Sequence, residues 1–404
     1  MKDIQKNPLI YNEEKINIIL NNSDLINKNK CDNQSNVQNK KKIRNPGIDL
    51  MRLIGMYIIV MNHMIFIGNA FKKFNKYYRQ LNILHILTDW HNNGFALLSG
   101  VVGYKSHKYS NLFYLWITVL FYSVGIHIFI KNFKKQFIIK ADISREFCPI
   151  VYRIYWYFTS YFGMYLYLPI INKGISCLTK YEFQLVIIST LGIFVLWKDL
   201  KNPNQDIFNM NKGGSMVWLL TFYLTGAYIG KYRVSYSGLK KYVYCFLYIF
   251  IYFFSSYLYI KVENNSLYLG NFYVSKKIII YLKKMLSMKY DSFLKISQSI
   301  TACLFFLQIN YSKPIAKAIC FLGPLSFGIY LIHIHPLMFS NVLRHIFDKD
   351  LNNINLYSTI ILILIKASKM FFFCLIIDYF RNLLFYFLRI KKLCIFFETM
   401  IINN

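Results

Sequence analysis

The residues best suited to chemistry lie in the first apolar stretch of the chain, where Arg52 and His63 stand 11 positions apart. On an α-helix each step turns about 100° and rises about 1.5 Å. The two side chains therefore share one helix face, about 16 to 17 Å apart along the axis. Asp49 precedes Arg52 by three residues, a spacing at which the two can form an ion pair across one turn.

An arginine near one end of a membrane helix and a histidine deeper within it would suit an anionic carrier whose reactive end reaches inward. Ionisable groups inside the hydrocarbon cost about 2.5 to 3.5 kcal/mol at a helix centre, so those that occur are functional hypotheses. The alternative is structural. Arg52 can extend to the interface, while His63 hydrogen-bonds a neighbouring helix.

The next apolar stretch contains both ionisable and small residues. Asp89 and His91 could line a polar cavity or lie among the lipid headgroups. Ser99 and Gly100 follow, and such small residues permit close helix packing.

A short basic segment follows these small residues and consists of Lys105, His107 and Lys108. Its positive charge suits phosphate groups. It is equally typical of an ordinary cytoplasmic loop, because such loops are enriched in basic residues.

Near the carboxyl end, Tyr330, His333 and His335 precede the helix-breaking Pro336. Two histidines two residues apart point to different faces of a helix, so they make a poor metal pair. The eight cysteines are scattered, without the close spacing of a zinc or redox motif. We expect no metal site.

The composition places these residues in a membrane protein. The 404 residues are 55% hydrophobic and 16% charged, whereas soluble chains carry about 25% charged residues. The net charge of +30 would suit nucleic acid in a soluble protein. Here the lysines are distributed among Asn, Ile, Tyr and Phe throughout, so we expect a lipid bilayer and no nucleic acid as partner.

Apolar stretches long enough to cross a hydrocarbon core of about 30 Å recur along the chain. They predict an all-α fold, a polytopic bundle of about ten transmembrane helices. The expected spans are 48–68, 83–104, 111–130, 155–171, 183–197, 215–229, 243–260, 293–309, 319–339 and 356–379.

The polar residues 1–43 end in a run of lysines and predict a disordered basic tail before the membrane domain at 44–398. Since basic residues favour the cytoplasmic side, we expect a cytoplasmic amino terminus. We expect a multi-pass protein of the plasma membrane.

Taken together, the motifs resemble the acyltransferase 3 family of multi-pass membrane acyltransferases, many of which O-acetylate glycans. The resemblance rests on four segments in family order: Arg52 with His63, then 95–100, 155–169 and 328–333. There are two departures. Ala96 stands where members often have a second aromatic residue, and Lys105 with His107 replaces a frequent pair of arginines.

The resemblance implies transfer of an acyl group, expected to be acetyl, from acyl-CoA to a hydroxyl of a glycan or lipid-linked sugar, with no bound cofactor. His63 would act at the thioester, as general base or through an acyl-imidazole, and Asp49 would orient Arg52. The expected donor-binding residues are Arg52, Lys105, His107, Lys108, Ser99 and Gly100.

Three aromatic or histidine residues are assigned to the acceptor side or to structure: Trp156, Tyr330 and His333. Two other readings compete with the enzyme. The first is a transporter or flippase of an anionic lipid-linked sugar that uses the same Arg52 and His63. The second is a catalytically idle scaffold with the same fold. Internal repeats, frequent in transporters, are not evident in the sequence.

Overall fold

The computed structural model describes residues 44–105, 108–133, 143–197, 206, 208–232, 239–263, 268–269, 272–273, 290–351 and 354–403. The predicted tail at 1–43 and His107 lie outside these residues. The described chain is helical apart from its loops and one two-residue antiparallel pair, which confirms the all-α prediction. This pair consists of β1 (Tyr268–Leu269) and β2 (Phe272–Tyr273).

The first half of the chain forms helices of 3 to 25 residues. They are α2 (Pro46–Phe66), α3 (Ala70–Lys73), η1 (Asn75–Tyr77), α4 (Tyr78–Thr88), α5 (His91–Gly103), α6 (Tyr109–Phe133), α7 (Ser144–Phe147), α8 (Trp156–Cys177), α9 (Lys180–Leu191), the π-helical turn η2 (Gly192–Trp197) and η3 (Asn211–Gly213).

The second half contains the longest helix. Its elements are α11 (Met216–Lys231), α12 (Leu239–Glu263), α14 (Phe293–Phe306), α15 (Lys313–Leu322), η4 (Gly323–Leu325), α16 (Ser326–His333), α17 (Pro336–Asn341), η5 (Leu343–His345), α18 (Leu356–Phe387) and α19 (Ile390–Asn403).

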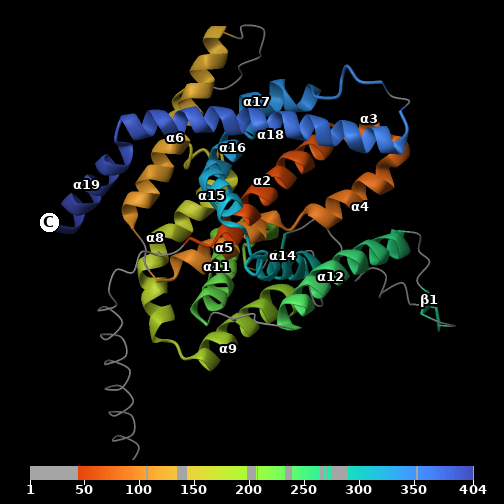
Figure 1. The fold of residues 1–404 in the computed structure, drawn as a ribbon, viewed down its shortest axis with the longest axis horizontal. Coiled ribbons are helices and arrows are strands. Elements are labelled where there is room, and N and C mark those ends of the chain that lie inside the picture. The colour runs from red at the N-terminus through yellow and green to blue at the C-terminus, as the bar shows by residue number, and fades with distance from the viewer. Residues whose placement is uncertain are drawn as a thin grey trace, which may run out of the picture.

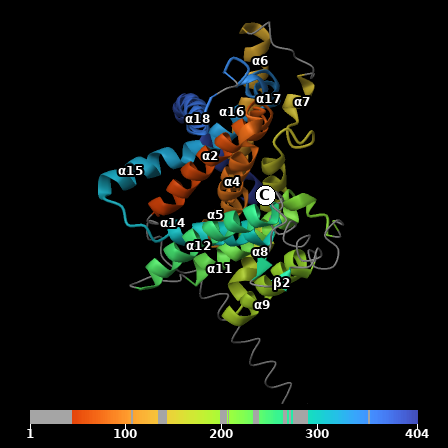
Figure 2. The same cartoon turned by 90° about the vertical axis from the view of Figure 1, so that its right-hand side faces the viewer.

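Helix α2 crosses the middle of the molecule, with α18 on one side and α12 and α14 on the other (Figure 1). The view turned by 90° keeps α2 between α18 and α14 (Figure 2). The sequence at its start favours a helix, because Asn45 caps it by accepting from the backbone N–H of Gly47 at 2.8 Å and Pro46 occupies the first turn. The predicted catalytic residues Asp49, Arg52 and His63 thus lie on the central helix.

Four helical segments among the described residues are long and apolar enough to cross a membrane: Pro46–Phe66, Tyr109–Phe133, Lys313–His333 and Leu356–Phe387. Large apolar side chains of α18 such as Phe372, Phe373 and Phe380 are more than half exposed, as expected of a surface that faces lipid. A helical membrane bundle is confirmed, and the number of ten spans stays a prediction.

The predicted span 83–104 is wrong as a single helix. The structure ends α4 at Thr88 and begins α5 at His91. Asp89 and Trp90 form the break and are buried, at 4% and 1% exposure. The polar residues around Asp89 are the local signal of this break, but apolar residues on both sides make the stretch long enough for a single span.

Helices α5 and α11 approach each other through glycines. A Cβ atom at Gly226 would lie 2.0 Å from the carbonyl oxygen of Leu97, and one at Gly100 would lie 2.0 Å from that of Tyr223. Because lipid gives little hydrophobic driving force between helices, such close backbone contact is a main source of their association. Gly100, expected at the donor site, is thereby placed in a helix contact.

A second contact joins α6, α16 and α18 through a buried ion pair. Arg381 pairs with Asp378 at 2.7 Å, and the Tyr122 hydroxyl donates to the same carboxylate at 2.7 Å. A Cβ atom at Gly328 of α16 would lie 1.9 Å from the Asp378 carboxylate. The ion pair therefore lies directly against the helix that carries Tyr330 and His333.

Gly226→Ala should destabilise the protein by about 1 to 3 kcal/mol or more, because the new methyl group meets backbone that no side-chain rotation can move away. Gly125→Ala is the matched control, since nothing lies within 4 Å of its Cβ position on α6. Thermal unfolding of both variants in detergent provides the comparison. Equal unfolding temperatures for the two would contradict the close packing of α5 and α11.

Candidate active site

A cavity of about 250 Å³ lies beside α2. This helix lines it with Arg52, Met56, Ile59 and His63, whose spacings of four, three and four residues define one helix face. The arginine and the histidine thus border the same space, with two apolar side chains between them. This geometry matches the shared face expected from the sequence.

The remaining walls are mostly aromatic and come from helices distant in sequence. They are Asn92, Phe95 and Ser99 of α5; Leu115 of α6; Trp156, Tyr157, Phe158 and Tyr161 of α8; Tyr290; and Gly323, Pro324, Ser326, Phe327 and Tyr330 of η4 and α16. Tyr157 also packs against both hydrophobic clusters of the protein. The cavity therefore lies where these clusters meet.

The Arg52 end of the cavity is organised by the buried carboxylate of Asp49. This carboxylate accepts from the Arg52 guanidinium at 3.1 Å and from that of Arg44 at 2.8 Å. Hydrogen bonding to Asp49 raises the pKa of Arg44 above its ordinary value. Arg52 and Arg44 keep 26% and 48% of their side chains exposed, so both can still contact an anion.

The His63 end is organised by a second histidine. His63 Nδ1 and His333 Nε2 lie 3.0 Å apart, within hydrogen-bond distance. His333 is fully buried behind His63, whereas His63 is partly accessible and borders the cavity. The structure thus places His333 directly behind His63, and His333 itself does not line the cavity.

Aromatic rings form much of the cavity wall outside α2. Trp156 and Tyr290 stack with ring centroids 5.9 Å apart and planes 13° apart. Tyr157 contacts Tyr330 edge-to-face at 6.5 Å. An apolar lining with a few polar groups at defined positions is typical of a small-molecule binding site.

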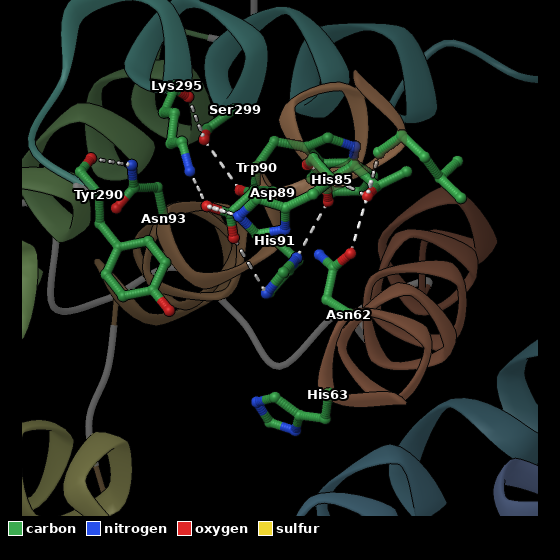
Figure 3. Close-up of polar contacts among 12 residues, drawn as sticks. Asn62, His63, His85, Asp89, Trp90, His91, Asn93, Tyr290, Lys295 and Ser299 are labelled. Carbon is green, nitrogen blue, oxygen red and sulfur yellow. Dashed lines mark hydrogen bonds and ion pairs between the residues drawn. The ribbon is translucent and has the colours of Figure 1, made fainter. Parts of the chain in front are cut away.

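A second polar cluster lies beside the cavity, at the break between α4 and α5 (Figure 3). Asp89 forms an ion pair with Lys295 of α14, and one ring nitrogen each of His85 and His91 lies 3.6 and 3.7 Å from the Asp89 carboxylate. All four side chains are at most 7% exposed. Asp89 and His91 are therefore buried inside the protein and do not lie among the lipid headgroups.

This cluster also fixes part of the cavity wall. Ser299 of α14 donates to the Trp90 carbonyl at 2.9 Å, and Asn93 donates to the Tyr290 carbonyl at 2.8 Å (Figure 3). The contacts tie α14 and the segment at Tyr290 to the start of α5. The cluster thus positions a wall of the cavity from outside it.

The predicted donor-binding residues are only partly brought together. Ser99 lines the cavity near Arg52, where its hydroxyl donates to the Phe95 carbonyl at 2.9 Å. Lys105 and Lys108 are described but do not line the cavity. Trp156 and Tyr330, expected on the acceptor side, both line it.

The sequence reasoning did not single out Arg44, Lys295 or Tyr290 as site residues. Lys295 had a usable signal, because a lysine within the apolar span at 293–309 needs a buried partner. For Arg44, the sequence gives no signal that distinguishes it from the neighbouring lysines of the tail. Tyr290 lies in a long polar segment, and no local pattern connects it to the cavity.

The fold and the cavity define a helical membrane protein with an arginine and a histidine along one wall of a largely aromatic binding site. A family model described as an acyltransferase domain matches residues 45–379. The chain belongs to this family, the acyltransferase 3 family, which confirms the resemblance seen in its motifs. No curated protein and no solved structure gives a significant match to the chain.

Membership makes the protein a membrane acyltransferase in general terms. The match begins at the cap residue of α2 and ends within α18, so it contains every residue of the cavity. Among the described residues, no group of three His, Cys, Asp or Glu side chains could hold a metal ion.

Lys295→Met should destabilise the protein by about 3 to 5 kcal/mol, because it leaves the buried Asp89 carboxylate without its cation. The double variant Asp89→Asn with Lys295→Met removes both charges, so its free energy of unfolding should fall clearly less than that of Lys295→Met. Denaturation in detergent measures both, with the exposed Lys72→Met as control. If the double variant were as unstable as the single one, the Asp89–Lys295 charge pairing would not be the interaction by which Lys295 stabilises the protein.

Proposed function

We propose that this acyltransferase moves an acetyl group from acetyl-CoA to a hydroxyl of a glycan or lipid-linked sugar. The observation that carries the proposal is that Arg52 and His63 border one cavity from the same face of α2. An arginine can hold phosphate by charge-assisted hydrogen bonds. A histidine in the same space can serve acyl transfer.

The donor would enter from the Arg52 end, taken as the cytoplasmic end of α2. Arg52 and Arg44 offer two guanidinium groups around Asp49 for its phosphates. Lys105 and Lys108, in the segment after α5, would add positive charge outside the cavity. Met56 and Ile59 provide an apolar wall between Arg52 and His63, along which the pantetheine arm would lie.

At the inner end, His63 would act on the thioester carbonyl. As general base it takes the proton from the acceptor hydroxyl while that oxygen attacks the carbonyl carbon. The carbon–sulfur bond then breaks, and the CoA thiolate takes the proton from His63. In the covalent alternative the His63 nitrogen attacks the carbonyl carbon, and the carbon–sulfur bond breaks to release the CoA thiolate. The acceptor hydroxyl then attacks the acyl-imidazole, the carbon–nitrogen bond breaks, and the hydroxyl proton passes to the thiolate. Both routes consume one acyl-CoA and one hydroxyl.

The aromatic wall would serve the acceptor. Trp156, Tyr157 and Tyr330 line the cavity, and aromatic rings pack well against the C–H faces of sugar rings. The acceptor would reach this wall from the side of the plasma membrane away from the donor. Mass spectrometry of surface glycans from cells with and without the gene would identify the acceptor.

His63→Ala should reduce acetyl transfer by at least about 10²-fold while the protein stays folded, because general base catalysis alone contributes about 10²- to 10⁴-fold. The assay follows labelled acetyl groups from acetyl-CoA to a glycan acceptor in purified detergent-solubilised protein. Wild-type turnover in a folded His63→Ala variant would exclude the assigned role. Glycan uptake into vesicles without release of free CoA would instead support a transporter.

Arg52→Lys should raise the KM for acetyl-CoA about 10- to 100-fold with a smaller change in kcat. Lysine keeps the charge but loses the guanidinium fork, and a hydrogen bond to a charged group contributes about 1.5 to 3 kcal/mol. Steady-state kinetics at varied acetyl-CoA measure this, with Lys72→Met as an exposed control. An unchanged KM would place the donor phosphates elsewhere.

A further inference from the structure

The hydrogen bonds of His333 determine which of its ring nitrogens carries the proton. His333 Nδ1 lies 2.6 Å from the carbonyl oxygen of Ile329, one helical turn earlier in α16. A carbonyl oxygen can only accept a hydrogen bond, so His333 Nδ1 must donate. In the neutral imidazole the other nitrogen, Nε2, then carries the lone pair and can only accept.

This arrangement determines the proton position on His63. His63 Nδ1 lies 3.0 Å from His333 Nε2. Because His333 Nε2 accepts, His63 Nδ1 must carry the hydrogen and donate it. A neutral His63 therefore has its lone pair on Nε2, and among the described residues the only hydrogen bond of its ring runs through Nδ1.

The His63 Nε2 lone pair is the group that either route of acyl transfer would use. His63 borders the cavity and is partly accessible there. His333 is fully buried on the other side of the ring. The opposite tautomer, with hydrogen on Nε2, would place two lone pairs against each other between the rings and would offer only a donor to the cavity.

We propose that His333 is a positioning residue that holds His63 in the Nδ1–H tautomer, with the Nε2 lone pair free to act in the cavity. The arrangement follows the logic in which a buried acceptor orients a catalytic imidazole, with a neutral histidine in place of a carboxylate. The tautomer follows from the geometry alone. Its consequence for catalysis rests on the proposed function.

The surroundings of His333 keep its ring in place. Its neighbours Ile329, Leu331 and Ile332 are all at most 3% exposed. Tyr330 contacts its ring edge-to-face at 6.4 Å. The ring is fully buried, and its hydrogen bond to the Ile329 carbonyl fixes its orientation within its own helix.

The matched variants are His333→Gln and His333→Leu. The glutamine side-chain oxygen can accept from His63 Nδ1–H, whereas leucine fills a similar volume and accepts nothing. Nitrogen-15 NMR of histidine-labelled protein in detergent reports the tautomer, and the signals of His63 are assigned by their loss in His63→Gln. This readout needs no substrate and no acyltransferase activity.

We expect the Nδ1–H tautomer of His63 in the wild type and in His333→Gln, and a mixture of tautomers in His333→Leu. An Nε2–H tautomer in the wild type would overturn the proposal, as would an unchanged His63 signal in folded His333→Leu. If His333→Leu does not fold, the wild-type tautomer and the His333→Gln variant decide the question.

With the acetyl-transfer assay, His333→Leu should lower kcat about 10²- to 10⁴-fold. The KM for acetyl-CoA should stay nearly unchanged, because Arg52 is untouched, and His333→Gln should recover part of the lost kcat. A kcat near that of wild type in His333→Leu would contradict the positioning role. If His63 has the Nδ1–H tautomer but the protein transfers no acyl group, the tautomer proposal is supported and the proposed function is rejected.

Discussion

Polar groups buried in a bundle surrounded by lipid must find their partners within the protein, and this requirement organises the structure. An unpaired charge in such surroundings costs several kcal/mol. Asp378 therefore pairs with Arg381 where α18 meets α6 and α16, and Asp89 pairs with Lys295 where α5 meets α14. The Asp89–Lys295 pair connects the break between α4 and α5 to α14, whereas the Asp378–Arg381 pair lies within α18 and is joined to α6 by the Tyr122 hydroxyl. The hydrogen bond of His63 follows the same rule within the cavity wall.

The cavity exists because some of these contacts are made outside it. Asn93 holds the segment at Tyr290, and Gly328 allows α16 to lie directly against the Asp378 carboxylate. Contacts outside the cavity thus hold the walls in place. The side chains that line the cavity keep polar atoms available to bind a ligand. Rigid support of this kind holds a reacting group in position, which is where much of an enzyme's rate enhancement originates.

The parts of this structure that depend on local periodicity could be predicted from the sequence. Helical spacing placed Arg52 and His63 on one face, and apolar composition identified a helical membrane protein. The partner of His63 could not be predicted, because His333 lies 270 residues away in the chain and only the packing of α16 against α2 brings it close. The break at Asp89 was missed because apolar residues lie on both sides of it, and whether a few polar residues end a helix or lie within it depends on tertiary partners such as Lys295.

Asp49 lies between Arg44 and Arg52, and its buried carboxylate already accepts hydrogen bonds from both guanidinium groups. In the proposed donor site, a phosphate would therefore share these donors with Asp49 and be held less tightly than by two unpaired arginines. Spent CoA carries the same phosphates as acyl-CoA, so under this proposal Asp49 would favour release of the product over tight binding of the donor.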